Sequence, residues 1–329
     1  MKLATLKDGS RDGQLVIVAR DLKTAVIANH IAPTMQNLLD SWDFMQPQCD
    51  DLYVQLNQGR APYSFDFDPK NCMAPLPRAY QFVDASAYVD YVELMCKARD
   101  NEMPDLFRTE PLVHQAASDD FIGACDPVLI ADEAWGIDFE SEIAVITGDV
   151  SMGSKPDHAR EQIRLIMLVN DFSLRELIPA DMKKGFGFMQ SKPTSSFSPV
   201  AVTPDELGDA WSKTKVHLPL RTSINGKLIA QPDAGVDMTF NFAQIIAFLT
   251  KTRNLKAGTV IGSGVIFNKD SAKGCGSLYG IRALEHIAGK EVSTPFLKFG
   301  DEIKIDMLDK QGKSIFGAID QQIKQHDNH

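Results

Sequence analysis

The chain has 329 residues and a net charge of −10, because 44 acidic residues outnumber 34 lysines and arginines. This excess of negative charge argues against a nucleic-acid partner, since no basic surface remains to neutralise a phosphate backbone. The apolar fraction of 44% is ordinary for a soluble globular protein, with neither a signal core nor an apolar segment of membrane-spanning length. We therefore expect a soluble protein that stays in the cytoplasm and has no membrane partner.

The N-terminal part of the chain predicts a small α+β unit. Short apolar runs at residues 15–19 and 25–28 alternate with segments that contain Gly13 and Asp21, as expected for strands joined by turns. An amphipathic stretch follows over residues 33–56, and we expect Pro47 to interrupt it.

Prolines then mark a domain boundary. Residues 61–77 contain four of them, which exclude a regular helix or a central strand. We place the boundary near residue 74, with an N-terminal domain over residues 1–74 and a second domain over residues 75–329.

The second domain predicts many strands and few helices. An Asn-Gly pair within residues 224–228 indicates a tight hairpin, and residues 301–308 alternate like a strand that enters a turn. Helices are expected over residues 241–250, with Asn241 as the cap, and over residues 157–169. The predicted fold class is therefore α+β, mainly β.

Three acidic residues at alternate positions, Asp138, Glu140 and Glu142, are the most informative feature of the chain. Residues 136–148 otherwise resemble a buried strand, so the three carboxylates are expected on one face. Neighbours on that face are roughly 7 Å apart and repel by about 2 kcal/mol per ionised pair at an effective dielectric of about 20. Either solvent at an edge strand or a bound divalent cation would offset this repulsion.

Other polar positions allow two interpretations each. Asp171 or Ser173 follows an apolar run and either caps a short helix, with Glu176 at capping-box spacing, or belongs to a polar site. Lys192 lies in a Ser/Thr-rich loop that is either a turn or an anion site. His114 has more polar neighbours in sequence than most other histidines of the chain, which leaves a structural and a functional role open.

Several of these segments together resemble the fumarylacetoacetate hydrolase family, in the family's order and over about three quarters of the chain. A further segment over residues 77–88 is similar to the longer bacterial members. The resemblance is carried by residues 136–144, residues 169–175, Lys192, residues 261–264 and residues 299–301.

The resemblance implies a small N-terminal domain, a C-terminal β-roll or sandwich domain and a homodimer. It also implies a Mg²⁺ or Ca²⁺ ion, with Mn²⁺ as a further candidate, which suits a set of hard oxygen ligands. Asp138 matches a position that is not normally a ligand. The implied metal ligands are Asp84, Glu140, Glu142 and Asp171.

The family reaction implied is hydrolysis of a carbon–carbon bond in a diketo acid, as when a fumarylacetoacetase of aromatic amino acid catabolism forms fumarate and acetoacetate. Lys192 matches the lysine that stabilises the departing carbanion or enolate. Tyr91, however, stands where the family has its general-base His, and Gly280 where it has the Glu that orients water. A phenol with a pKa near 10 is a poor base at neutral pH.

The other implied site residues line the substrate side. Val265 replaces a Thr of the family and removes a hydroxyl suited to a substrate carboxylate. His114 occupies a place where relatives commonly have Tyr, so we hypothesise that His114 is a relocated base and Tyr91 supplies the hydroxyl. The substrate-binding residues implied are Ser86, Arg175, Ser195 and Val265.

Three functions follow from this pattern. The first is a metal-dependent hydrolase of small 2-oxo or 1,3-dioxo carboxylates. The second is a decarboxylase, tautomerase or hydratase of 2-oxo acids in the same superfamily, which uses the same metal-stabilised enolate. The third is a non-catalytic homologue that keeps its metal.

Overall fold

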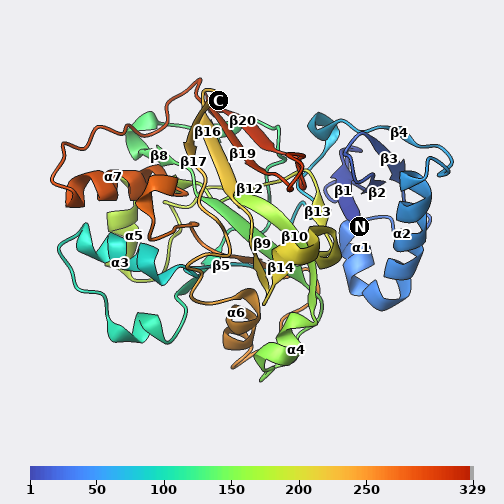
Figure 1. Cartoon of the computed structure of the whole chain (residues 1–329), viewed down its shortest axis with the longest axis horizontal. Coiled ribbons are helices and arrows are strands. Elements are labelled where there is room, and N and C mark those ends of the chain that lie inside the picture. The colour runs from blue at the N-terminus through green and yellow to red at the C-terminus, as the bar shows by residue number, and fades with distance from the viewer. Residues whose placement is uncertain (327–329) are drawn as a thin grey trace.

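A large mixed sheet runs through the whole molecule, which a computed structural model describes over residues 1–326 (Figure 1). The sheet has 11 strands, and β1 pairs with β13, so the N-terminal strands extend the sheet of the second domain. Its strands, in order across the sheet, are β4 (Phe65–Asp66), β3 (Thr24–Ile27), β2 (Gln14–Val18), β1 (Lys2–Leu6), β13 (Ala201–Val202), β10 (Ile163–Asn170), β9 (Ser141–Thr147), β18 (Val260–Gly262), β5 (Phe82–Ala85) and β6 (Val113–Ala116), with β12 (Ser196–Phe197) beside β10.

A second sheet of five strands packs over the middle of the first. Its strands, in order, are β17 (Lys227–Ala230), β16 (Leu220–Ile224), β19 (Glu302–Met307), β20 (Ile319–Gln325) and β7 (Val128–Ile130). Two short ladders complete the β structure, namely β8 (Ile137–Asp138) with β11 (Ser173–Leu174) and β14 (Trp211–Ser212) with β15 (Lys215–Val216).

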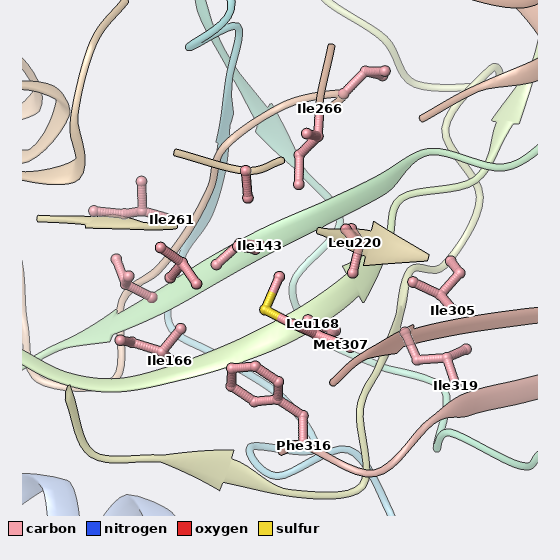
Figure 2. Close-up of a cluster of buried hydrophobic side chains, with 14 of the residues drawn as sticks. Ile143, Ile166, Leu168, Leu220, Ile261, Ile266, Ile305, Met307, Phe316 and Ile319 are labelled. Carbon is pink, nitrogen blue, oxygen red and sulfur yellow. The ribbon is translucent and has the colours of Figure 1, made fainter. Parts of the chain in front are cut away.

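The main core lies between these two sheets. Figure 2 shows Ile143 and Leu168 of the large sheet facing Leu220 and Ile305 of the smaller one. All four side chains are buried. This sandwich of apolar side chains confirms the predicted mainly β, α+β fold.

The central strands are buried on both faces. Ile166 and Leu168 of β10 belong to the core between the sheets, whereas Leu165 and Met167 belong to a second core toward the N-terminal helices. The prediction of a helix over residues 157–169 is therefore wrong beyond its first turn, where α4 (Pro156–Arg160) ends. A strand covered on both faces is continuously apolar, and its sequence resembles that of a buried helix.

The N-terminal domain places two helices against the far end of the large sheet (Figure 1). They are α1 (Met35–Asp40) and α2 (Trp42–Asn57), and the break between them falls at Ser41. The predicted interruption at Pro47 is wrong, since this residue lies inside α2. Pro47 is exposed and near the helix start, so only one intrahelical hydrogen bond is lost and water can reach the free carbonyl group.

The remaining helices surround the second domain. Figure 1 shows α3 (Val89–Lys97), α5 (Ile178–Lys184) and α7 (Leu278–Ile287) gathered at the end opposite the N-terminal domain. The predicted helix over residues 241–250 is confirmed as α6 (Phe242–Leu249), and Asn241 forms a capping box with Gln244. Among residues 1–326, no helix is long and apolar enough to span a membrane.

Candidate metal centre

Four buried acidic side chains converge where the central strands of the large sheet end. Asp84 lies on β5, Glu142 on β9, Glu140 just before β9 and Asp171 just after β10. One carboxylate oxygen from each residue lies within 4.8 Å of the others. Because β10, β9, β18 and β5 are neighbours in the sheet, residues distant in sequence meet at one point. The structure thus brings together the four acids that the resemblance implies as ligands.

Solvent does not separate these acids. Their exposed fractions are 6% or less, so the explanation of a wetted edge strand is excluded. Burial and the neighbouring acids raise the pKa of Asp84 to about 7 and raise the pKa of Glu142. Oε1 of Glu142 is buried and has no hydrogen-bond partner among residues 1–326. A hard divalent cation fits this donor set, because it would bind the unsatisfied oxygen and offset the crowded charge.

Two glycines of the Gly-Ser-Gly run form one wall of the acid cluster. A Cβ atom on Gly262 would lie 2.2 Å from Oδ1 of Asp84 and 3.2 Å from Oε2 of Glu142. The backbone N–H of Gly264 donates to these same two carboxylates, at 3.1 and 3.0 Å. Glycine therefore lets the backbone approach the acids closely, and the approach leaves no room for a side chain.

Asp138 lies apart from this cluster. It accepts hydrogen bonds from the backbone N–H groups of Leu278 (2.7 Å) and Tyr279 (3.0 Å) at the start of α7, and from Nε of Arg175 (2.7 Å). The expected uninterrupted strand over residues 136–148 is in fact β8 and β9 with a break between them. The first acid of the triplet therefore anchors the start of α7.

Two buried cations partly neutralise the acids. Nζ of Lys192 donates to Oε2 of Glu140 (2.7 Å) and to Oδ2 of Asp171 (2.6 Å), while Nη2 of Arg175 donates to Oε1 of Glu140 (2.6 Å). Burial opposes the ionisation of Glu140, but the two cations outweigh burial and lower the pKa of this carboxyl group to about 2. Glu140 is thus the acid of the cluster most firmly held as a carboxylate.

Hydroxyl groups add hydrogen bonds to two acids of the cluster. Ser173 donates to Oε1 of Glu140 at 3.1 Å, and Ser195 donates to Oδ1 of Asp171. Ser173 therefore does not cap a helix, since it lies on β11 and contacts a candidate ligand. Ser195, expected to bind substrate, is buried behind Asp171 and orients that carboxylate.

A cavity of about 470 Å³ opens beside the acids. It contains one polar wall, formed by Asp84, Glu140 and Lys192, and one wall of apolar side chains from α3 and α5. Most of the predicted catalytic and substrate-binding residues line it, namely Ser86, Tyr91, His114, Arg175, Lys192 and Val265. This combination of an enclosing apolar surface and convergent charges is typical of a small-molecule site.

Tyr91 and Gly280 occupy the two positions at which the resemblance implies water-activating residues. The Tyr91 hydroxyl lies 3.0 Å from Oγ of Ser277, the cap residue of α7, and burial raises its pKa well above 10. A Cβ atom on Gly280 would lie 2.2 Å from Sγ of Cys275 and 3.0 Å from the Tyr91 ring. These two side chains therefore fill the space that a residue at position 280 would need.

His114 stands on the opposite side of the cavity, on β6. Its ring packs edge-on against Phe188, with the ring centroids 5.3 Å apart. Burial and the Lys192 charge lower the pKa of His114, although Asp171 and Glu140 oppose this effect. The imidazole is therefore neutral at pH 7.

Three contributors to the site were missed from the sequence. Gly262 and Gly264 were noted only as part of a resemblance, and Ser173 only as a helix cap or a member of an unspecified polar site. Glycines that follow an apolar run near the end of a strand are a usable signal, because a strand glycine often marks a close approach by another group. No comparable signal exists for the apolar wall, because the apolar residues of α3 and α5 resemble those of any amphipathic helix.

Comparison with known proteins gives curated relatives of several activities. A 2,4-didehydro-3-deoxy-L-rhamnonate hydrolase from Sphingomonas sp. (strain SKA58) is 27% identical over 212 residues, covering 63% of this chain and 65% of the relative. The mitochondrial oxaloacetate tautomerase fahd2 of Xenopus laevis is 26% identical over 47% of each chain. The oxaloacetate tautomerase YcgM of Escherichia coli is 29% identical, over 43% of this chain and 64% of the relative. The chain thus spans less than two thirds of the length of these relatives.

Solved structures share the fold over nearly the whole chain. A maleylpyruvate hydrolase from Sphingobium sp. SYK-6, crystallised with manganese(II) and pyruvate, has a TM-score of 0.66 at 15% identity, over 99% of this chain and all of that one. The fumarylacetoacetate hydrolase of Exiguobacterium antarcticum has a TM-score of 0.65 at 17% identity, with the same coverage. The family model for the N-terminal domain 2 of fumarylacetoacetases matches residues 1–78. The model for the C-terminal domain of fumarylacetoacetate hydrolases matches residues 81–324, and the chain therefore belongs to the fumarylacetoacetate hydrolase family.

Proposed function

We propose that this chain catalyses the metal-dependent enolisation of a small 2-oxo dicarboxylate, interconverting its keto and enol forms. In this reaction a proton leaves the carbon next to the 2-oxo group and a proton is added to the 2-oxo oxygen, so no water is consumed and no other bond breaks. The observation that carries the proposal is the filled space around Gly280, where Cys275 and Tyr91 exclude the Glu that hydrolysis in this family requires.

The chemistry of the acid cluster supports this proposal. When bound by Asp84, Glu140, Glu142 and Asp171, a divalent cation such as Mg²⁺ or Mn²⁺ would supply Lewis-acid polarisation of the 2-oxo group and its neighbouring carboxylate. Lys192 adds a positive charge beside Glu140 and Asp171, with a side chain only 7% exposed. These two acids raise the pKa of Lys192 and outweigh burial, so its ammonium group remains charged and stabilises developing negative charge on the substrate.

The apolar wall strengthens these electrostatic effects. Apolar side chains such as Val92, Met95 and Phe188 line the cavity that the acids share. They exclude water from the reacting atoms, and a lower local dielectric makes each charge interaction stronger. Enolisation benefits directly, because its difficult step is the creation of negative charge on an oxygen atom.

Arg99 is the residue we assign to the second carboxylate of the substrate. It is exposed, lines the cavity beyond the apolar wall, and stacks over the Tyr279 ring at 5.8 Å. Arg175, by comparison, is occupied by Asp138 and Glu140, so its guanidinium group is poorly placed to receive a new carboxylate. The oxaloacetate tautomerases among the relatives act on a substrate of this dicarboxylate class.

Hydrolysis of an acylpyruvate is the second candidate, and His114 is the observation that favours it. A neutral imidazole in the cavity is a suitable general base at pH 7. We rank this candidate below enolisation because, among residues 1–326, Nε2 of the imidazole has no hydrogen-bond partner that would orient the ring in place of the missing Glu.

One pair of assays distinguishes these functions. Purified protein is loaded with Mg²⁺ or Mn²⁺, and the conversion of freshly dissolved enol-oxaloacetate to its keto form is followed by ultraviolet absorbance. We expect acceleration over the buffer rate, loss of this acceleration with EDTA, and a higher KM in Arg99→Met. Release of pyruvate from an acylpyruvate, without any acceleration of ketonisation, would instead favour hydrolysis. Inactivity of the metal-loaded protein in both assays would favour a non-catalytic homologue.

A further inference from the structure

His114 and Asp84 are direct neighbours across two paired strands. The register of β5 and β6 places Asp84 opposite His114, so both side chains project from the same face of the sheet. This face carries the acid cluster and forms one wall of the cavity. The backbone pairing therefore directs the imidazole toward the same point as the carboxylates.

The imidazole has an unsatisfied nitrogen atom. Nε2 of His114 is buried and has no hydrogen-bond partner in the described part of the chain. Phe188 packs against the ring and offers no hydrogen-bonding group to it. Buried polar atoms of folded proteins are nearly always paired. An unpaired nitrogen beside an acid cluster therefore indicates that a bound group interacts with it.

The distances are compatible with one shared cation. A ring nitrogen of His114 and carboxylate oxygens of Asp84 and Asp171 all lie within 4.8 Å of one another. Asp84 and Asp171 also belong to the four-acid group. Two ligands on opposite sides of a cation, each about 2.0–2.4 Å from it, are separated by roughly 4–5 Å, so these atoms can surround a single ion.

We propose that His114 is a nitrogen ligand of the cation, which makes this a mixed nitrogen and oxygen centre that favours Mn²⁺, Fe²⁺ or Co²⁺ over Mg²⁺ and Ca²⁺. Imidazole suits first-row transition metals, whereas Mg²⁺ and Ca²⁺ prefer oxygen ligands. The inference rests on the metal dependence of the proposed function and makes His114 a ligand together with Asp84 and Asp171, the two acids of the cluster that are grouped with it.

The same assignment bears on the choice between enolisation and hydrolysis. A ring nitrogen that binds a cation has no lone pair left to accept a proton from water. A His114 that is a ligand would therefore lose its role as the relocated base, and the exchange of roles between Tyr91 and His114 would not restore hydrolysis. Enolisation consumes no water, so it does not require His114 to generate a water nucleophile.

The test reads the ligand atoms directly. Metal-free protein is loaded with one equivalent of Mn²⁺, and electron spin echo envelope modulation is recorded to detect nitrogen bound to the ion. We expect ¹⁴N modulation in the wild type, a change to the ¹⁵N pattern after labelling with ¹⁵N-histidine, and no nitrogen modulation in His114→Phe. Exposed His217 provides the matched control, and His217→Phe should keep the signal.

Calorimetry provides the second readout. We expect His114→Phe to weaken Mn²⁺ binding by about tenfold or more and Mg²⁺ binding much less. Circular dichroism of the metal-free variant checks that it folds, and the isotope experiment on the wild type needs no variant at all. Mn²⁺ binding without any histidine nitrogen signal would overturn this inference and leave the acid site intact. A wild type that binds no divalent cation would overturn both this inference and the proposed function.

Discussion

Gly262 and Asp84 lie opposite each other in the parallel pair of β18 and β5, and a Cβ atom at position 262 would lie 2.2 Å from Oδ1 of Asp84. Real Cβ atoms do not approach a carboxylate oxygen this closely, so either the acid or the strand must move when a methyl group is added. The close approach of the backbone is thus part of how the acids are held together.

We therefore expect Gly262→Ala to weaken binding of Mn²⁺ or Mg²⁺ by about tenfold or more, since a ligand is displaced. Overpacking should also lower the free energy of unfolding by about 1–3 kcal/mol. Calorimetry and urea unfolding measure the two effects. Gly148→Ala, beyond the other end of β9, is the control because its added methyl group would meet mainly the flexible side chains of Arg164 and Gln162. Unchanged metal affinity in Gly262→Ala would contradict the role of this glycine.

Glu142 should destabilise the metal-free protein. Burial, Asp84 and Asp171 raise its pKa above the ordinary value, so the folded state disfavours the carboxylate and loses stability as the pH rises past about 4.5. We expect Glu142→Gln to increase the unfolding free energy of the metal-free protein at pH 8 by about 1–3 kcal/mol. The stabilisation that Mn²⁺ gives the wild type should largely disappear in the variant. Thermal unfolding with EDTA and with Mn²⁺ measures both, and a destabilised metal-free variant would argue against uncompensated charge at this position.

Asp138 should stabilise the fold, in contrast to Glu142, although it is a buried acid of the same triplet. Three donors converge on its carboxylate, namely Nε of Arg175 and two N–H groups of α7, whereas Oε1 of Glu142 has none within the described part of the chain. We expect Asp138→Asn to cost about 2–4 kcal/mol in both metal-free and metal-loaded protein, because an amide cannot accept from all three donors. Urea unfolding under both conditions tests this. A cost seen only with metal present would make Asp138 part of the metal centre.

The sequence predicted the acid quartet through a resemblance and the hairpin and capping elements through local chemistry. Asn241 and the Asn-Gly pair at residues 225–226 are examples in which a side chain or a turn conformation decides the structure locally. The strand at residues 163–170 was missed because tertiary burial on both faces removes the alternation that identifies strands. The prediction at Pro47 failed for a related reason. The free energy that a proline costs inside a helix depends on whether water reaches the carbonyl group that it leaves without a hydrogen bond.

The separation of Asp138 from Glu140 and Glu142 could not be derived from spacing alone. The break between β8 and β9 depends on the pairing of β8 with β11, a contact between residues far apart in sequence. The position of His114 opposite Asp84 depends in the same way on the register of β6 with β5. Local patterns identify which residues are unusual, whereas strand pairing decides which of them meet.

Tyr91 stands at the family's general-base position, and we expect its role there to be structural. Its hydroxyl group lies 3.0 Å from Ser277, which caps α7 by accepting from the N–H of Gly280 at 3.0 Å. We expect Tyr91→Phe to lower the unfolding free energy by about 1 kcal/mol through loss of this hydrogen bond, and to change the ketonisation rate by less than about threefold. Stability and steady-state kinetics are measured on the same preparation. A much larger fall in kcat, at unchanged KM, would return Tyr91 to a catalytic role.

Glu206 and Arg20 give a stability prediction that depends on pH and lies far from the metal centre. Arg20 follows β2 and donates to the Glu206 carboxylate through Nε (3.1 Å) and Nη2 (2.9 Å), which joins the N-terminal domain to the segment after β13. Burial alone would raise the pKa of Glu206, but the hydrogen bonds with Arg20 help to lower it to about 2. A depressed folded-state pKa means that the contribution is complete above about pH 4.5 and is lost as the pH falls toward 2.

We expect Glu206→Gln to cost about 1 kcal/mol at pH 7, a modest value because the Arg20 side chain is 69% exposed and solvent screens the pair. The difference from wild type should shrink as the pH falls from 4.5 toward 2, because the wild-type carboxylate then becomes protonated. Urea unfolding at pH 7, 4 and 3 measures this trend. Glu302→Gln, at an exposed carboxylate on β19, serves as the control and should show a smaller effect at every pH. A difference between Glu206→Gln and wild type that stays constant over this range would show that the lost ion pair is not the cause of the destabilisation.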